Sequence, residues 1–200
     1  MKNKLWIIGV LILIVLAVFI CMRFLPKQEN NNINSASKVL VVYYSAQGHT
    51  DNVAVSIASN LNADIFKIEP INPYTSDDLN YNNSNSRVSK EYKDESLRNV
   101  ELKNTKVPNW NEYDTVLIGY PIWWGIAAWP VNNFIKDNDF TGKTIIPFCT
   151  SASSSLGQSG KLLEDMANGG NWLDGHRFSS NESESSIKNW TDTIINKEEK

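Results

Sequence analysis

The chain has 200 residues, of which 42% are hydrophobic and 10% aromatic, a composition that suits one packed domain. It carries 19 Lys and Arg against 22 Asp and Glu, for a net charge of −3. Lys2, Lys4 and Arg23 flank an apolar N-terminal segment, so the remaining 16 Lys and Arg against 22 Asp and Glu give about −6. This acidic balance argues against nucleic acid as a partner, because binding to the phosphate backbone requires clustered Lys and Arg.

The N-terminus contains an uncharged apolar run, Leu5–Met22, which as a helix reaches about 27 Å and is long enough to span a bilayer. A cleaved signal peptide is the alternative, but the small-residue cleavage site that it requires is absent around Phe19-Ile20-Cys21. We therefore expect four segments along the chain. They are a basic tail at 1–4, a transmembrane anchor at 5–25, a flexible linker at 26–37 and one domain at 38–196.

This anchor predicts a single-pass protein of the cell membrane. Lys2 and Lys4 precede the span and Arg23 and Lys27 follow it, so the charge bias that orients such proteins is slight. We expect the domain to lie outside the cytoplasm.

The domain begins with Lys38–Tyr44, a β-branched-rich apolar run typical of a central strand that is covered on both faces. From Thr50 the spacing becomes helical, with Val53, Ile57 and Leu61 on one stripe. A second strand is predicted at Ala63–Ile68, and the sequence of strand, helix and strand indicates a right-handed parallel crossover.

Residues 70–108 are polar and rich in Asn and Ser, and we expect a long surface excursion with a helix near Val88–Leu97. Beyond it, strands and helices alternate again. The later strands are predicted at Thr115–Gly119, Lys143–Cys149 and Trp172–Phe178, and the later helices from about Pro130, at Gly160–Ala167, and around Ile187, Trp190, Ile194 and Ile195. This alternation predicts an α/β fold with three layers, in which helices cover a doubly wound, five-stranded parallel sheet.

Ligands of such sheets bind beyond the carboxyl ends of the strands, so the loops after the first, third and fourth predicted strands share one edge. The first loop combines small and hydroxyl residues with a glycine before a helix N-terminus, which suits a phosphate group. Its candidate residues are Ser45, Ala46, Gln47, Gly48, His49 and Thr50. The alternative is that these are ordinary turn and capping residues.

The second loop places two adjacent tryptophans at a strand end, where a planar aromatic ligand can stack. Its candidate residues are Pro121, Ile122, Trp123, Trp124 and Gly125. The alternative is that one indole packs beneath the loop as a core residue.

The third loop, Thr150–Gly157, offers hydroxyls and backbone amides that can hydrogen-bond the polar rim of a heterocycle. Its candidate residues are Thr150, Ser151, Ala152, Ser155 and Gly157. The alternative is a flexible, Ser-rich linker.

Taken together, these loops resemble the flavodoxin-like family, especially the subgroup with Gly-Tyr-Pro-Ile-Trp-Trp-Gly, here residues 119–125. The resemblance covers about Lys38 to Asn196 and implies a flavodoxin-like fold with strand order 2-1-3-4-5 and bound flavin mononucleotide (FMN). By this resemblance, Ser45–Thr50 hold the FMN phosphate. Residues Pro121–Gly125 flank the isoalloxazine, with Trp123 stacked on it, and Thr150–Gly157 contact its pyrimidine side.

The sequence departs from the family pattern at two places. Gln47 stands where a hydroxyl residue is usual, and the third loop lacks the Tyr that covers the outer flavin face in many short flavodoxins. The second departure leads us to expect a flavin face that is open to acceptors.

No other chemistry is indicated. His49 and His176 lack metal-ligand spacing, and Cys149 has no identifiable base, so the reaction is expected to be that of the cofactor. The favoured function is a flavin redox protein that transfers electrons at the membrane to redox partner proteins or quinone-like acceptors. The alternatives are an FMN-dependent NAD(P)H/quinone-type reductase and a flavin-less interaction module.

Overall fold

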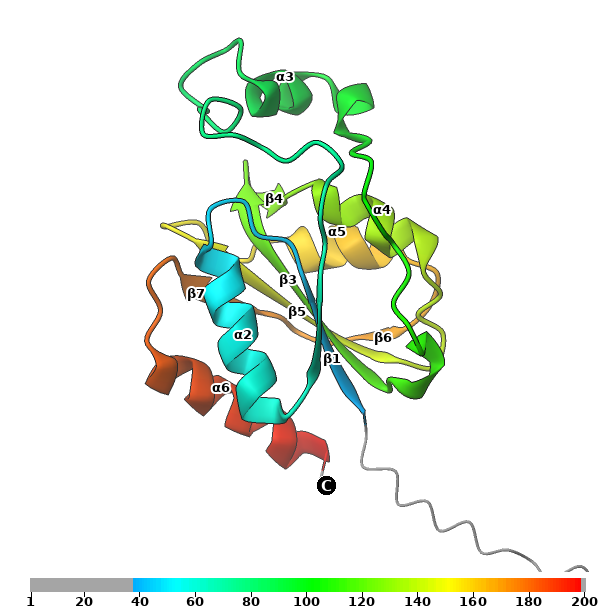
Figure 1. Ribbon diagram of the computed structural model, residues 1–200. Coiled ribbons are helices and arrows are strands. Elements are labelled where there is room, and N and C mark those ends of the chain that lie inside the picture. Colours follow the sequence, from blue (N-terminus) through cyan, green and yellow to red (C-terminus); the bar gives the residue numbers. More distant parts are fainter. Residues whose placement is uncertain (1–37, 199–200) are drawn as a thin grey trace, which may run out of the picture. The chain divides into compact units, whose positions relative to one another are not determined.

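The structure is a computed structural model that describes residues 38–198 (Figure 1). The predicted tail, anchor and linker at 1–37 lie outside the described residues. Within 38–198, no helix is long and apolar enough to cross a membrane.

A parallel sheet lies at the centre of the domain, in the order β2-β1-β3-β5-β6. Helices cover both of its faces, with α2 and α6 on one side and α4 and α5 on the other (Figure 1). The strands of this path are β1 (Val39–Tyr43), β2 (Asp64–Lys67), β3 (Thr115–Trp123), β5 (Thr144–Ser151) and β6 (Asn171–Trp172). The helices are α2 (His49–Leu61), α4 (Pro130–Asp137), α5 (Ser159–Met166) and α6 (Glu184–Glu198). The α/β class and the parallel sheet are thus confirmed.

The expected count of five strands is wrong, because the sheet has seven. Strand β3 continues past the predicted end at Gly119 to Trp123, and its last residues pair with a short antiparallel strand, β4 (Ile126–Ala127). The strand expected at 172–178 is interrupted, so that β6 and β7 (His176–Ser179) each pair with β5 separately. The sheet therefore differs from the predicted order 2-1-3-4-5 in two respects. The short strand β4 is added beside β3, and the predicted last strand is divided into β6 and β7.

The division of the last strand has its cause in Pro147 of β5. The backbone oxygen of Ile145 accepts a hydrogen bond on the side of β5 that faces β6 and β7. Pro147, two residues later, faces the same side and has no N–H to donate. Ile145 pairs with Trp172 and Phe148 with His176, so three steps along β5 match four steps along its neighbour. The extra residue carries the chain past the missing donor.

Strand β1 is buried on both faces, as its continuous apolar pattern predicts. Val41 and Tyr43 pack with α2 and α6, whereas Leu40, Val42 and Tyr44 pack on the side of α4 and α5. A shift of one residue would exchange the two sets between the faces, so this packing fixes the strand register and thereby the position of the loop that follows β1.

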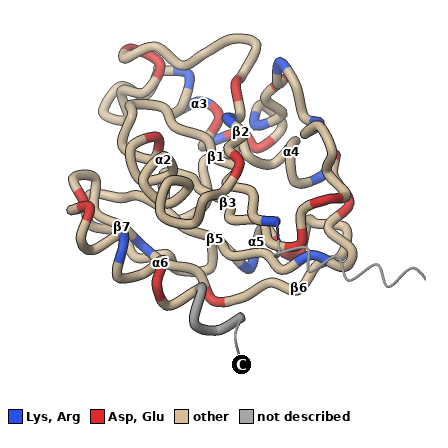
Figure 2. The backbone as a smooth tube through the Cα atoms, turned by 60° about the horizontal axis from the view of Figure 1, so that its bottom comes forward, with Lys and Arg blue, Asp and Glu red and all other residues tan. Residues whose placement is uncertain are grey.

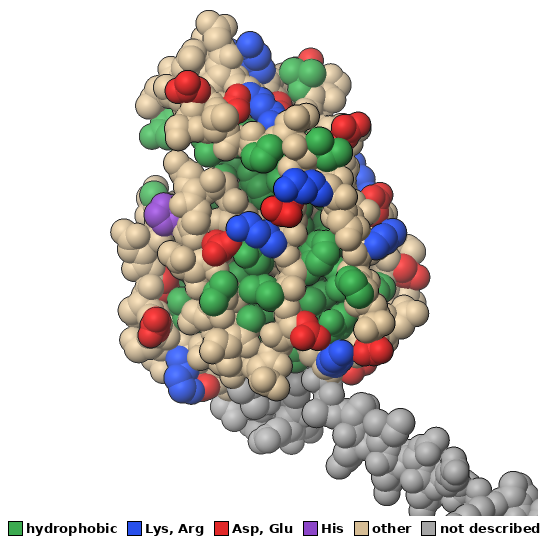
Figure 3. Space-filling view, in the orientation of Figure 1, with side chains coloured by type: hydrophobic (Ala, Val, Ile, Leu, Met, Phe, Trp, Pro, Cys, Tyr) green, Lys and Arg blue, Asp and Glu red, His purple; other side chains and the backbone are tan. Residues whose placement is uncertain are grey.

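The sheet edge at β2 is short and bordered by charge. Ile65 is 46% exposed, and hydrophobic side chains are visible among charged ones on this side of the molecule (Figure 3). Asp64 accepts a hydrogen bond from Tyr113, and Lys67 pairs with Asp51 at 2.7 Å. Charged residues on a four-residue edge strand oppose pairing with another chain. Along the whole described backbone, Lys and Arg are interspersed with Asp and Glu (Figure 2).

The excursion between β2 and β3 contains α3 (Arg87–Lys93) and the short 3-10 helices η1 (Glu95–Arg98) and η2 (Trp110–Glu112). Its base is closed by backbone hydrogen bonds from Ile71 to Glu101 at 2.9 Å and from Lys103 to Glu69 at 2.8 Å. Helix α3 lies beyond the end of the sheet where β3 and β4 meet (Figure 1). The excursion therefore stands beside the edge at which the sequence predicts a ligand.

A buried carboxylate, Glu91 of α3, connects the excursion to the sheet domain. Its Oε2 accepts hydrogen bonds from the Tyr74 hydroxyl at 2.6 Å and from Trp129 Nε1 at 2.7 Å, while Oε1 accepts from Arg87 Nε at 2.7 Å. Trp129 directly precedes α4 and is fully buried. The Arg87 guanidinium also lies 3.8 Å from the centre of the Tyr74 ring. Each oxygen of the buried charge thus has a donor.

We expect Glu91→Ala to lower the free energy of unfolding by about 2–4 kcal/mol, because the buried Tyr74 hydroxyl and Trp129 indole and the partly buried Arg87 guanidinium lose a charged acceptor. The matched control is Glu95→Ala, four residues later, whose side chain is 82% exposed and pairs with Arg98. That loss is expected to be below about 1 kcal/mol. Urea unfolding of the two variants measures both values, and equal losses would contradict the role given to Glu91.

Candidate functional site

A pocket of about 590 Å³ opens at the carboxyl ends of β1, β3 and β5. It brings together twelve of the residues that the sequence singles out, namely Ser45, Ala46, Gln47, His49, Thr50, Pro121, Ile122, Trp123, Trp124, Thr150, Ser151 and Ala152. Four others, Gly48, Gly125, Ser155 and Gly157, do not line it. The three predicted loops therefore meet at one cavity.

Sequence reasoning missed six lining residues, which are Leu79, Tyr81, Val88, Ser153, Ser154 and Ser180. Ser180 follows β7, so the rule that strand ends share an edge was sufficient to predict it. Ser153 and Ser154 belong to the third loop but were not selected within it. Leu79, Tyr81 and Val88 come from the excursion, whose polar pattern carries no sign of proximity to the site.

The first loop turns at Gly48, which has φ +90° and directly precedes α2. The Gly48 N–H donates to Ser45 Oγ at 3.1 Å, and its carbonyl accepts from Asn52 N at 3.0 Å as the helix begins. A Cβ at Gly48 would meet nothing within 4 Å, so the positive φ, and not a clash, is what requires glycine. With no capping side chain at this position, the first N–H groups of α2 face the loop as potential anion donors.

Hydrogen bonds hold the start of the third loop to the first loop and to β7. The hydroxyls of Thr50 and Thr150, both buried, lie 2.8 Å apart. Arg177 of β7 donates from Nε to Ser151 Oγ at 3.0 Å and from Nη2 to the carbonyls of Ser151 at 2.8 Å and Ala152 at 3.1 Å. Thr150 and Ser151 belong to β5. The start of the third loop is thus held in place, unlike a flexible linker.

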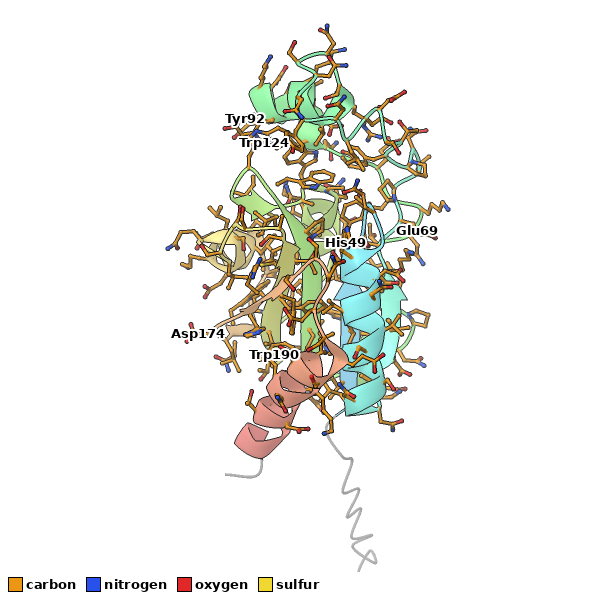
Figure 4. All side chains as sticks on the ribbon, turned by 90° about the vertical axis from the view of Figure 1, so that its left-hand side faces the viewer. His49, Glu69, Tyr92, Trp124, Asp174 and Trp190 are labelled. Carbon is orange, nitrogen blue, oxygen red and sulfur yellow. The ribbon has the colours of Figure 1, made fainter. Side chains whose placement is uncertain are left out.

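The second loop is a two-residue hairpin turn between β3 and β4. Trp124 has φ +47° and Gly125 has φ +82°, the pair of positive values that defines a type I′ turn. A tryptophan in the left-handed region is strained, by about 1–3 kcal/mol. Its indole stacks on Tyr92 of α3 at 4.5 Å and 10°, and lies 6.0 Å from Trp129 at 21° (Figure 4). These near-parallel contacts offset the strain and join the turn to the excursion.

Trp123 packs among three other rings, all in edge-to-face geometry. The ring centres lie 4.8 Å from Trp129, 5.1 Å from Tyr74 and 5.8 Å from Tyr44. Trp123 is half-buried against the core and also lines the pocket. It thus combines the two roles that the sequence left open, a core contact below and an aromatic surface at the cavity.

The charges around the pocket are sparse. No Lys or Arg is among the lining residues of the described chain, and His49 is the lining side chain that can become a cation. Within residues 38–198, no three His, Cys, Asp or Glu side chains are grouped as metal ligands. Cys149 is buried, and burial raises the pKa of its thiol to about 12, which leaves it protonated and non-nucleophilic at neutral pH.

Residues 38–194 match the family model described as flavodoxin. The chain belongs to the flavodoxin family. Among solved structures it is similar to two proteins assigned as flavoproteins. The one from Bacteroides eggerthii is 40% identical, with 80% of this chain and 98% of that chain covered and a TM-score of 0.71. The one from Bacteroides uniformis is 38% identical, with 78% and 98% covered and a TM-score of 0.72.

A third structure, a flavoprotein from Lactobacillus acidophilus in complex with FMN, is 21% identical, with 78% of this chain and 99% of that chain covered and a TM-score of 0.51. At this identity the likeness concerns the fold alone. No curated protein matches the chain. Family membership thus rests on the match to the family model and on the two Bacteroides structures.

The strained turn yields a paired prediction. In Trp124→Asn, a residue that tolerates the left-handed region replaces the indole, so the relief of strain offsets most of the lost stacking and the free energy of unfolding changes by less than about 1 kcal/mol. In Trp124→Val, the stacking is lost and a β-branched residue takes the same φ, so we expect a loss of about 2–3 kcal/mol. Urea unfolding compares the two variants, and equal stabilities would show that the turn is not strained.

Proposed function

We propose that this protein binds FMN in the pocket and transfers electrons at the membrane. The observation that carries the proposal is the pocket's composition. A glycine turn and a helix N-terminus border it at the first loop, aromatic rings border it at the second, and hydroxyl groups border it at the third. Its 590 Å³ lies within the range of cofactor sites. FMN, when bound, supplies the redox chemistry through reversible reduction of its ring.

The residues present fit the parts of this cofactor. Backbone N–H groups at the start of α2, with the hydroxyls of Ser45 and Thr50, suit a phosphate. Trp123 offers the ring platform, and the third-loop serines offer polar contacts at the opposite side of the pocket. One short phosphate-binding turn favours the mononucleotide over the dinucleotide FAD.

The experiment that tests this proposal is reconstitution of the purified protein with flavins. We expect a flavin absorption spectrum, release of FMN on denaturation, and tighter binding of FMN than of FAD. A protein that binds no flavin would support an interaction module instead, and equal affinity for FMN and FAD would contradict the single phosphate site.

A second role, as an FMN-dependent NAD(P)H/quinone-type reductase, is favoured by the aromatic rim of the pocket. Tyr81 is 72% exposed and Trp124 is 39% exposed, and both line the cavity from its solvent side. The third loop has no Tyr, but the excursion places Tyr81 at the same pocket. A planar acceptor can therefore approach between exposed rings. Reduction of the bound FMN by NAD(P)H alone would support the reductase, whereas dependence on a protein donor would support the carrier.

We further propose that residues 5–25 anchor the domain to the membrane and that the domain lies outside the cytoplasm. The support is the uncharged run Leu5–Met22. Protease added to intact protoplasts should then digest the domain, and protection would reverse the orientation.

Substitution of Gly48 separates phosphate binding from ring binding. We expect Gly48→Val to weaken FMN by about 10- to 100-fold and riboflavin by less than about threefold, because a strained turn loses hydrogen bonds to a charged group while the aromatic wall remains. Isothermal titration of both flavins measures the two affinities.

The matched control is Gly142→Val. Gly142 also has a positive φ, +79°, and open space around its Cβ position. It lies just before the amino end of β5, however, and so at the end of the strands opposite the pocket. The Gly142→Val variant should have similar backbone strain and bind FMN and riboflavin with unchanged affinities. Equal weakening of FMN and riboflavin in Gly48→Val would contradict a phosphate role for the first loop.

A further inference from the structure

His49 is placed so that one contact shows that its Nδ1 carries a hydrogen. It is the first residue of α2, it lines the pocket, and its Nδ1 lies 2.7 Å from the backbone oxygen of Ser180 (Figure 4). A carbonyl oxygen only accepts, so Nδ1 carries the hydrogen and donates it. In the neutral ring, Nε2 then has a lone pair, and it becomes a donor only when the ring is a cation.

The charged groups around His49 are engaged elsewhere. On α2, Asp51 accepts from the Tyr43 hydroxyl and from Lys67, both at 2.7 Å. Before α6, Glu182 accepts from the backbone N–H and the hydroxyl of Ser179. On β7, Arg177 donates to the start of the third loop, as described above. Hydrogen bonds from Lys67 to Asp51 and from the Ser179 backbone to Glu182 hold the pKa of both carboxyl groups below its usual value, so both stay charged near neutral pH.

A phosphate bound in this pocket would find no Lys or Arg among the described lining residues. With Nε2 toward a bound phosphate, the neutral lone pair would oppose the phosphate oxygens, and a protonated Nε2–H would add a charge-assisted hydrogen bond. Binding of a phosphate dianion therefore favours the cationic ring, and protonation of the ring favours binding. By linkage, this contribution is present at low pH and is lost as the pH rises.

We propose that His49 makes phosphate recognition in this pocket proton-coupled, so that the preference for FMN over riboflavin depends on pH. The inference rests on the proposed function, because it requires a flavin whose phosphate lies at the first loop. His49 is thereby a specificity-determining residue, which distinguishes the phosphorylated flavin from its unphosphorylated form.

The test is titration of the full-length protein with FMN and with riboflavin between pH 6.5 and 8.5, a range in which a phosphate monoester is mainly a dianion because its second pKa is about 6. We expect the ratio of the riboflavin dissociation constant to the FMN dissociation constant to fall by about tenfold as the pH rises from 6.5 to 8.5. A tenfold change is the size of one charge-assisted hydrogen bond. Calorimetry at pH 7.5 in buffers of different ionisation enthalpy should show uptake of up to one proton with FMN and none with riboflavin.

Two variants make the test specific. His49→Asn keeps a polar side chain without a titratable group, and it should bind both flavins with a ratio that does not change with pH. His176→Asn removes the other histidine, which packs against Trp190 and does not line the pocket, and it should retain the wild-type pH dependence.

Inorganic phosphate distinguishes recognition of phosphate alone from recognition of the whole cofactor. It should compete with FMN and leave riboflavin binding unchanged. A constant ratio in the wild type, or the same pH dependence in His49→Asn, would overturn the role of His49 while FMN binding stands. Failure to bind either flavin would overturn the proposed function and this inference together.

Discussion

The buried carboxylate of Glu91 is the interaction on which the aromatic side of the site depends. It accepts from two donors that are distant in the sequence, since Tyr74 lies 17 residues before it and Trp129 lies 38 residues after it, and from Arg87 on its own helix. Removing a charge from water is costly, so the carboxylate is stable only where these donors converge. The position of α3 beyond the end of the sheet is therefore coupled to the position of Trp129, which packs against both pocket tryptophans.

This coupling explains how a strained turn can be retained at the pocket. Trp124 takes a backbone conformation that suits Asn or Gly, and its indole makes near-parallel contacts with Tyr92 and Trp129. Both of these partners depend on Glu91, because Tyr92 is its neighbour on α3 and Trp129 is its hydrogen-bond donor. Strain at a binding site persists only where surrounding contacts over-determine it. The excursion is thus a structural support of the second loop.

The sequence predicts the features that depend on local pattern and misses those that depend on distant contacts. Lys38–Tyr44 is recognisable as a central strand because burial on both faces selects an unbroken apolar run, and the loops follow from strand ends that share an edge. The break opposite Pro147 was missed because the lost donor acts across strands. Tyr81 was missed because the chain around it is polar, and the excursion is joined to the sheet domain by contacts between residues distant in the sequence, among them the hydrogen bond from Trp129 to Glu91.

The electrostatics of the site follow from the small number of charged side chains around the pocket. The chain as a whole is acidic, at −3, and the described pocket lining contains no Lys or Arg. In the proposed function, the FMN phosphate at the first loop would therefore be stabilised by oriented dipoles, namely the N–H groups of α2 and the hydroxyls of Ser45 and Thr50. In the role proposed for His49, a histidine with one nitrogen committed to a carbonyl makes the preference for the phosphorylated flavin depend on pH, because its second nitrogen becomes a donor only when the ring is protonated.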